Sequence, residues 1–174
     1  RDGKSDLLAP GSTDAGLREI YGANPARTFA AAANRVAVGT GPAGIAVGDI
    51  DRDGLLDCFT ANAGGNTVSA VRQTSAGNYS VMMSPATGAG PSGVVAGDFN
   101  RDGRLDAVTA NAAGASVSTL LGDGAWNFAN APGSPRAATH APYALAAGDV
   151  DGDGDLDVVT ANHDNATVSV YLNA

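Results

Sequence analysis

Acidic side chains recur in three short segments of this 174-residue chain, and their spacing suits a metal ion. Each segment reads D-x-[DN]-x-D-G-x-x-D, with oxygen-bearing side chains at positions 1, 3, 5 and 9 and glycine at position 6. We name them loop 1 (residues 49–57), loop 2 (98–106) and loop 3 (149–157). A hard cation such as Ca²⁺ takes about 6–8 oxygen ligands, which alternate residues of a tight loop can supply. The glycine permits the sharp turn, because it adopts a positive φ without a clash.

Electrostatic repulsion argues against reading these loops as ordinary solvated acidic turns. Two like charges about 4 Å apart cost about 4 kcal/mol at an effective dielectric constant near 20. Loops 1 and 3 carry at least four carboxylates each, whereas loop 2 has Asn100 in place of one. Such crowding at a repeated spacing indicates a cation between the carboxylates. We expect Ca²⁺ at about three sites, with loop 2 the weakest because it carries one negative charge fewer.

The residues around each loop separate this pattern from an EF-hand. An EF-hand needs a bidentate Glu at position 12 and a helix on each side. Thr60, Thr109 and Thr160 occupy that position here. The flanking segments are short, β-branched and bounded by glycine, which is typical of strands. Each loop is therefore predicted to join two strands.

The repeat extends well beyond the loops. Corresponding aspartates lie 49 residues apart (Asp49 to Asp98) and then 51 residues apart (Asp98 to Asp149). Each loop is followed by Thr-Ala-Asn and then, five residues after the Asn, by Thr-Val-Ser or Ser-Val-Ser. A fixed period of this size is typical of a solenoid, a propeller or an array.

Each repeat is predicted to hold four short antiparallel strands, which is the make-up of a β-propeller blade. The first strand precedes the loop, the second follows it, the third covers the Thr-Val-Ser segment and the fourth carries an aromatic residue, namely Phe29, Tyr79 or Phe128. A parallel β-roll is disfavoured because its nonapeptide Gly-Gly-x-Gly-x-Asp pattern is absent. The fold class predicted is therefore all-β, a β-propeller built of four-stranded antiparallel blades.

The chain is predicted to be a single repeat domain, residues 1–174, with about three and a half blades. The predicted units are a partial blade lacking its first strand (1–41), two blades (42–90 and 91–141) and a partial blade lacking its last strand (142–174). The first unit begins inside a loop pattern. Asp2 and Asp6 alone are not expected to hold a cation well, because positions 1 and 3 are missing.

These motifs together resemble the FG-GAP/VCBS repeats, the calcium-loop blades of integrin α-subunit propellers and of related microbial propellers. The resemblance rests on the Asp loop with Gly-Asp, Thr-Ala-Asn and Thr-Val-Ser at fixed offsets, and it covers essentially the whole chain. The Phe-Gly-Gly-Ala-Pro signature of integrins is reduced to segments such as Gly41-Pro42-Ala43-Gly44, which favours the microbial branch.

The resemblance implies that Ca²⁺ binds in the turn between the first two strands of a blade. The implied side-chain ligands are Asp49, Asp51, Asp53 and Asp57 in loop 1, Asp98, Asn100, Asp102 and Asp106 in loop 2, and Asp149, Asp151, Asp153 and Asp157 in loop 3. Backbone carbonyls of Leu55, Arg104 and Asp155 would complete the three coordination shells.

The resemblance also implies a secreted or cell-surface protein that binds a glycan or an extracellular protein in adhesion. The alternative is a structural repeat module of a larger surface protein or filament, in which calcium only stiffens the blades. An enzyme is not expected, since no nucleophile-elbow motif is present and His140 and His163 lack the spacing of a metal pair. Trp126, Tyr143 and Tyr171 could stack on a sugar ring, although core packing is equally expected for Trp126.

Composition bears on the remaining partners. The net charge is −8 and no basic cluster is present, so nucleic-acid binding is not expected. No apolar run is long enough for a membrane-spanning helix. The single cysteine, Cys58, cannot form an internal disulfide and shares its repeat position with Ala107 and Val158, which predicts a small buried residue. An open arc of blades would expose sheet edges, so we expect self-association or a longer parent polypeptide.

Overall fold

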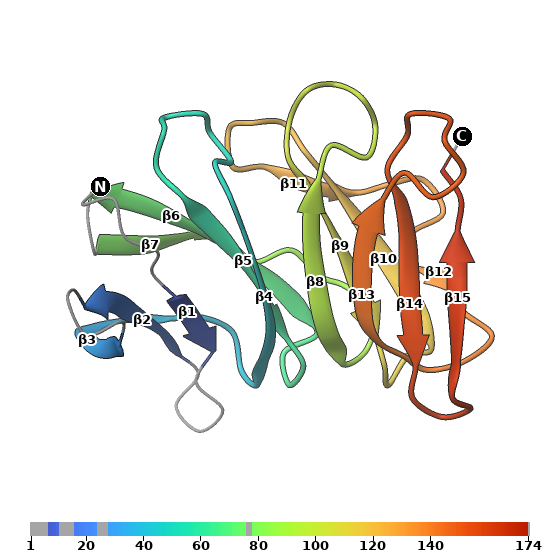
Figure 1. Cartoon of the computed structure of the whole chain (residues 1–174), viewed down its shortest axis with the longest axis horizontal. Helices are drawn as coiled ribbons and strands as arrows, with labels where there is room; N and C mark the ends of the chain where they lie inside the picture. Colours follow the sequence, from blue (N-terminus) through green and yellow to red (C-terminus); the bar gives the residue numbers. More distant parts are fainter. Residues whose placement is uncertain (1–6, 11–15, 24–27, 76–77, 174) are drawn as a thin grey trace.

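The computed structural model describes residues 7–10, 16–23, 28–75 and 78–173. Within these ranges fifteen strands form four separate antiparallel sheets, which we name sheets I to IV in chain order (Figure 1). The described residues contain no helix, and hence none that could span a membrane. The predicted fold class, antiparallel all-β with four-stranded sheets, is confirmed.

The two central sheets contain the complete repeats. Sheet II runs in the order β4 (Pro42–Gly48), β5 (Asp57–Asn62), β6 (Thr67–Ser75) and β7 (Asn78–Met83). Sheet III contains β8 (Pro91–Gly97), β9 (Asp106–Asn111), β10 (Ser116–Gly122), β11 (Phe128–Asn130) and β12 (Arg136–Ala137). In each of these two sheets the Asp loop joins the first strand to the second.

The two end sheets have three strands each in the described residues. Sheet I consists of β1 (Leu7–Pro10), β2 (Gly16–Ala23) and β3 (Thr28–Ala37). Sheet IV consists of β13 (Pro142–Gly148), β14 (Asp157–Asn162) and β15 (Thr167–Tyr171), with loop 3 between β13 and β14.

The outer strand of sheet III departs from the single fourth strand that the repeat predicts. Both β11 and β12 pair with β10, and residues 131–135 separate them. Pro132 and Pro135 lie in this segment and have no N–H to give to the ladder. The Thr119 N–H instead donates to the Ser134 hydroxyl at 2.9 Å, and the Ala131 N–H donates to the Thr119 carbonyl at 2.9 Å. A side chain thus replaces a strand partner at this point.

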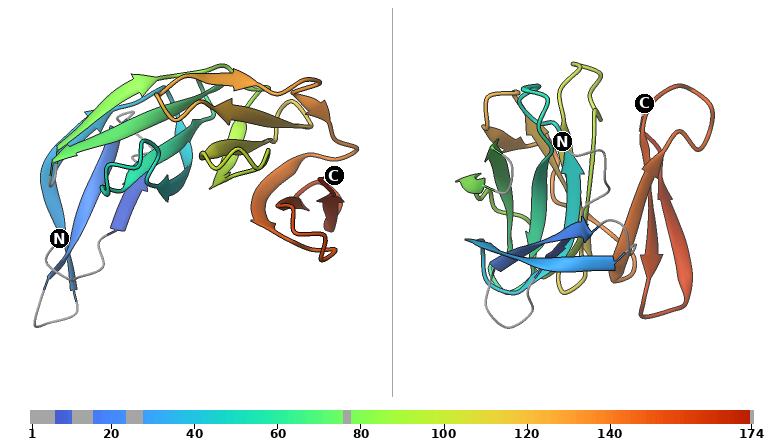
Figure 2. Two further views of the ribbon diagram at one scale, coloured as in Figure 1. Left: turned by 90° about the horizontal axis from the view of Figure 1, so that it is seen from above. Right: turned by 60° about the vertical axis from the view of Figure 1, so that its left-hand side comes forward.

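The sheets follow one another along an arc, from sheet I at one end to sheet IV at the other (Figure 2, left). Their first strands meet on one side, where β4 contacts β8 and β8 contacts β13. Glycine makes this approach possible, because a Cβ atom on Gly44 would lie 2.8 Å from the Gly93 Cα atom. The first strands are therefore held as close as their backbones allow.

Hydrophobic side chains fill the spaces between successive sheets. Phe59 of β5 and Phe128 of β11 pack edge to face between sheets II and III, with ring centroids 5.2 Å apart. A second cluster, which includes Phe99, Val117 and Val158, lies between sheets III and IV. Apolar packing thus joins sheets II, III and IV along the arc, as expected for blades.

A polar network repeats inside sheets II, III and IV, and it accounts for the Thr-Ala-Asn and Thr-Val-Ser motifs. In sheet II the fully buried Asn62 amide donates to Thr67 and Ser69, at 3.1 and 3.0 Å, and accepts from Thr60 at 3.4 Å. The same bonds recur around Asn111 and Asn162. Buried polar groups need such partners, so the motif fixes the pairing of the second and third strands.

Candidate metal centres

The three loops share one backbone conformation, which depends on two left-handed residues. Position 6 is glycine in each loop, with φ of 85°, 81° and 90° in loops 1, 2 and 3. Position 4 also has a positive φ, at Arg52 (60°), Arg101 (58°) and Gly152 (84°). This conformation is unfavourable for a side-chain-bearing residue, so the surrounding loop must hold the two arginines in place.

Backbone N–H groups hold the carboxylates at positions 1 and 5 toward the loop interior. The N–H of the position 6 glycine donates to the position 1 aspartate at 2.9, 2.7 and 3.1 Å in loops 1, 2 and 3. The N–H at position 7 donates to the position 5 aspartate at 2.8 Å in all three. The backbone therefore holds the carboxylates at positions 1 and 5 in the same way in each loop.

The aspartate at position 9 ties each loop to its sheet. The fully buried Asp57 carboxylate accepts the Ile50 N–H at 2.9 Å and the Gln73 N–H at 2.8 Å. Burial raises the pKa of Asp57 above its ordinary value, and the two N–H bonds offset this only in part. The pKa of Asp106 is raised for the same reason.

Asp157 occupies position 9 of loop 3 and differs in its acidity. Its pKa lies below the ordinary value, because the Asn173 and Val150 N–H groups donate to its carboxylate. No further sheet covers sheet IV among the described residues, so less protein surrounds this carboxylate despite its lack of accessible surface. Hydrogen bonding to the charged form then outweighs desolvation.

Carboxylates converge closely enough for a shared cation in loops 1 and 3. Asp49, Asp51 and Asp57 each offer an oxygen atom, and these atoms lie within 4.8 Å of one another. In loop 3 the same holds for Asp149, Asp151 and Asp153. The predicted side-chain ligands outside these two trios are Asp53, Asp98, Asn100, Asp102, Asp106 and Asp157. In the described part of the chain no third trio of this kind forms.

One buried carboxylate oxygen of loop 1 lacks a hydrogen-bond donor. Asp49 Oδ1 is buried and has no hydrogen-bond partner among the described residues. Leaving a buried acceptor unpaired is costly, and a cation at the centre of the trio would satisfy it. The residues of loop 1 therefore fit a divalent cation that prefers oxygen ligands.

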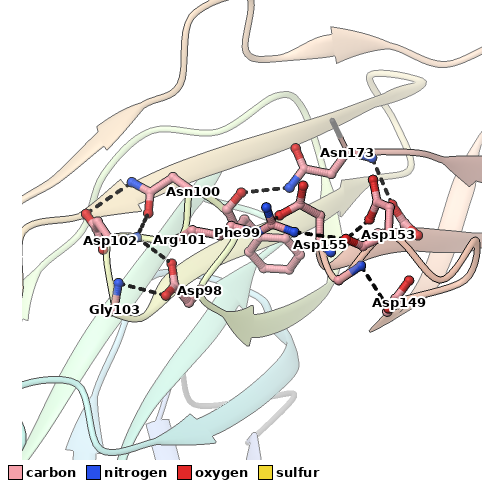
Figure 3. Close-up of polar contacts among 12 residues, drawn as sticks. Asp98, Phe99, Asn100, Arg101, Asp102, Gly103, Asp149, Asp153, Asp155 and Asn173 are labelled. Atoms are coloured by element: carbon pink, nitrogen blue, oxygen red, sulfur yellow. Dashed lines mark hydrogen bonds and ion pairs between the residues drawn. The ribbon is translucent and has the colours of Figure 1, made fainter.

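Loop 2 is arranged differently at its third position. The Asn100 amide donates to Asp102 Oδ2 at 3.1 Å, and its oxygen accepts the Asp102 N–H at 3.0 Å (Figure 3). The amide thus takes up part of the carboxylate that a cation would use. Its carbonyl oxygen still points into the loop and remains a suitable calcium ligand.

Loops 2 and 3 are bridged directly by side chains. Arg101 of loop 2 forms an ion pair with Asp155 and donates to the Asp153 carbonyl oxygen at 3.2 Å (Figure 3). In return the Asn173 side chain donates to the Phe99 carbonyl oxygen of loop 2 at 2.7 Å. The two loops therefore form one connected polar surface.

Loop 1 contacts two side chains that sequence reasoning did not assign to it. Arg72 of β6 approaches Asp51 Oδ2 at 2.9 Å through Nε and Asp53 Oδ2 at 3.1 Å through Nη2. Trp126, from the turn between β10 and β11, donates its indole N–H to Asp51 Oδ2 at 3.2 Å. Arg72 stands at the repeat position of Leu121 and Leu172, and this departure from the repeat is the signal that could have found it.

The other predicted candidates are dispersed. Tyr143 lies beside His163, with ring centroids 5.6 Å apart, and Tyr171 lines a cavity of about 340 Å³ between sheets III and IV. His140 lies 3.7 Å from Asp164. The three aromatic residues considered for sugar stacking are thus in separate places, and Trp126 is engaged with loop 1.

Comparison with known proteins agrees with this geometry. A model of the FG-GAP-like repeat matches residues 49–109 and 99–160, which include all three loops. The chain belongs to the FG-GAP-like repeat family. No match was found among curated proteins.

Two solved structures share the fold of this FG-GAP-like repeat chain. One is a protein from Lactobacillus plantarum, with 18% identity and a TM-score of 0.55, matched over 97% of this chain and 52% of its own. The other is a putative 6-phosphogluconolactonase from Bacteroides uniformis, with 13% identity and a TM-score of 0.57, matched over 96% and 52%. The chain therefore spans about half the length of each neighbour. Their likeness supports the propeller arrangement of its sheets.

The expectation that the FG-GAP-like chain is not an enzyme needs correction. One protein with this arrangement of sheets is described as a putative 6-phosphogluconolactonase, so the fold occurs in a protein assigned an enzymatic activity. At 13% identity the likeness concerns the fold and brings no activity to this chain. The missing nucleophile motif is thus no ground for excluding catalysis, and that exclusion is withdrawn.

Proposed function

We propose that this chain is a calcium-binding segment of an extracellular β-propeller that binds a glycan or another protein. The observation that supports it most is the carboxylate trio of loop 1, with the buried and unpartnered Asp49 Oδ1. The proposed ligands are the side chains at positions 1, 3, 5 and 9 and the carbonyl at position 7. Loop 2 is proposed to bind most weakly, because Asn100 replaces a carboxylate.

The proposed location follows from the expected affinity. Loops of this kind in extracellular modules bind Ca²⁺ with a Kd on the order of 10⁻⁴–10⁻³ M. Sites this weak fill only where calcium is abundant, as it is outside cells. We therefore propose a secreted or cell-surface location, which is consistent with a role as an adhesion or lectin-like module.

The calcium proposal is tested by thermal melting with calcium and with a chelator, together with isothermal titration. A ligand that binds only the folded state raises its stability by mass action, so calcium is expected to raise the Tm. Asp149→Asn should lower the heat of binding, whereas Asp164→Asn, which removes a charge outside the loops, should leave it unchanged. Equal Tm values in both conditions and no heat of binding would refute the proposal.

A structural role for calcium is the second candidate, and the bridges between loops 2 and 3 favour it. Arg101 and Asn173 connect these loops across two sheets, so a cation in loop 3 would also stiffen the contact with loop 2. The two candidates are separated on a glycan array in the presence of calcium. Binding that a soluble glycan abolishes would support a glycan-binding function. Absence of binding at high protein concentration would support the purely structural role.

A further inference from the structure

We propose that Arg72 is a built-in competitor of calcium at loop 1, and that calcium must displace its guanidinium to bind there. This inference rests on the proposed function of the loops. It makes loop 1 a weaker calcium site than loop 3, although both carry aspartate at positions 1, 3, 5 and 9. Arg72 would compete with the ion for the carboxylates and would not be a ligand.

The contacts of Arg72 place a positive charge where the cation would act. Its guanidinium lies 2.9 Å from Asp51 and 3.1 Å from Asp53, which are the side-chain ligands at positions 3 and 5. Asp51 is part of the converging trio, but Asp53 is not, and it pairs with Arg72 instead. In loop 3, where Asp153 belongs to the trio, Leu172 replaces the arginine.

Arg72 is an incomplete substitute for a metal ion. It reaches two of the four loop 1 carboxylates and leaves Asp49 Oδ1 buried without a partner among the described residues. A calcium ion, with its larger number of ligands, can satisfy that oxygen as well. The Arg72 side chain is 36% exposed overall, but its Nε is buried and has no hydrogen-bond partner among the described residues. Displacement by the ion would therefore break one hydrogen bond, from Nη2 to Asp53, and would let Nε reach water.

Of the three repeats that contain a complete loop, only the first has an arginine at this position of its third strand. Leu121 and Leu172 hold the position of Arg72, and neither can pair with a carboxylate. Arg72→Leu therefore restores the residue that the other two repeats use. Arg72→Gln removes the charge while keeping a polar side chain, and Arg72→Lys keeps the charge.

Trp126 provides a signal that belongs to loop 1. It is the only tryptophan in the chain, and its indole N–H lies 3.2 Å from Asp51 Oδ2. Terbium, which binds oxygen sites like those of calcium, emits strongly when a nearby tryptophan transfers energy to it, and the transfer falls steeply with distance. Excitation where only tryptophan absorbs therefore reports occupancy of loop 1. Trp126→Phe and Asp49→Asn should abolish this signal.

The experiment titrates terbium into the folded chain and its variants, with calcium as the competitor. Arg72→Leu and Arg72→Gln are expected to lower the terbium midpoint at loop 1 about tenfold, the effect of removing two partly exposed ion pairs. Arg72→Lys should stay near the original midpoint. Arg136→Leu, which removes an exposed positive charge on β12 outside the loops, should leave the loop 1 midpoint unchanged.

A second readout separates competition from a merely structural role. In chelator, Arg72→Leu should lower the Tm, because the loop 1 carboxylates lose their counter-charge. The rise in Tm from chelator to calcium should be larger for this variant than for the original chain. A lower Tm in chelator without tighter binding would mean that Arg72 is only structural.

Two outcomes overturn the inference and are distinguishable. If calcium and terbium bind nowhere in the chain, the proposed function fails and this inference fails with it. If titration calorimetry shows calcium binding but Arg72→Leu and Arg72→Gln leave the loop 1 midpoint unchanged, the inference alone is wrong.

Discussion

At the scale of single residues, the buried asparagines show how a repeat motif becomes structure. Asn111 has no accessible surface, and its amide donates to Ser116 and Ser118 while its oxygen accepts from Thr109. All its hydrogen-bonding partners come from the two strands it joins. The recurrence of Thr-Ala-Asn therefore reflects stability of the sheet rather than ligand binding.

Asn111→Ala should be among the most destabilising single changes in the chain. It leaves buried hydroxyl groups without partners and opens a small cavity, so we expect a loss of about 2–4 kcal/mol in the free energy of unfolding. Chemical denaturation measures it. Asn130→Ala, at an exposed position, should cost less than about 1 kcal/mol. Equal costs for the two variants would show that the network contributes little.

Cys58 should be inert while the protein is folded. It has no accessible surface, and burial, with the charge of Asp57, raises the pKa of its thiol to about 12. The thiolate is the reactive form, so near neutral pH a disulfide reagent should react only after denaturant is added. Rapid labelling of the native protein would contradict the burial. Cys58→Ala, the residue found at Ala107, should remain folded.

Residue types alone could predict the loops but not what competes within them. The spacing of aspartates is visible in the sequence, and the structure places those side chains in similar loops. Arg72 and Trp126 lie 21 and 75 residues beyond Asp51, so their contacts depend on strand pairing and on the packing of one sheet against the next. No local pattern carries that information.

At the scale of elements, the first strands of neighbouring sheets lie so close together that their glycines tolerate larger residues poorly. A Cβ on Gly44 would lie 2.8 Å from the Gly93 Cα atom, which belongs to the backbone. A Cβ on Gly93 would lie 2.8 Å from Leu145 Cδ2, the end of a flexible side chain. The first clash requires a strand to move, whereas the second requires mainly a change of rotamer.

Gly44→Ala should therefore destabilise the chain more than Gly93→Ala. Overpacking of this kind costs about 1–3 kcal/mol, and we expect Gly44→Ala near the upper end and Gly93→Ala near the lower. Gly148→Ala is the matched control, because no atom lies within 4 Å of its added Cβ. Thermal unfolding in calcium ranks the three variants. A Gly93→Ala variant less stable than Gly44→Ala would contradict the ranking.

The positions of strands were largely predictable, and the exception has a local cause. The alternation of loop, Thr-Ala-Asn and Thr-Val-Ser places the first three strands of sheets II, III and IV. The fourth strand carries little more than an aromatic residue as its signal, and in sheet III it is split into β11 and β12. Pro132 and Pro135 could have indicated the break, since proline cannot donate to a ladder.

At the scale of the whole molecule, sheet IV presents a face that the other sheets bury. Val68, Val117 and Val168 share one repeat position and are 0%, 6% and 69% exposed. Ile50 and Val150 share another and are 2% and 53% exposed. Elsewhere the following sheet covers these positions, so the face of sheet IV has the composition of an interface.

We expect the chain to self-associate through this face at micromolar concentration. Light scattering should give a mass above 17.1 kDa, and Val168→Lys combined with Val150→Lys should return it to that of a monomer. Circular dichroism checks that the variant keeps its sheets. A wild-type chain that remains monomeric and unfolds cooperatively would show that the face needs no partner.

The contact between Trp126 and loop 1 gives the repeats a fixed order. Most of the repeated bonds would survive if two copies traded places, because each copy supplies its own. The indole of Trp126, in sheet III, donates to Asp51 of loop 1, in sheet II. This bond forms only when sheet III follows sheet II. An engineered chain with sheets II and III exchanged would retain every motif and lose that bond, and it should melt earlier. The copies are thus alike in composition but not interchangeable in position.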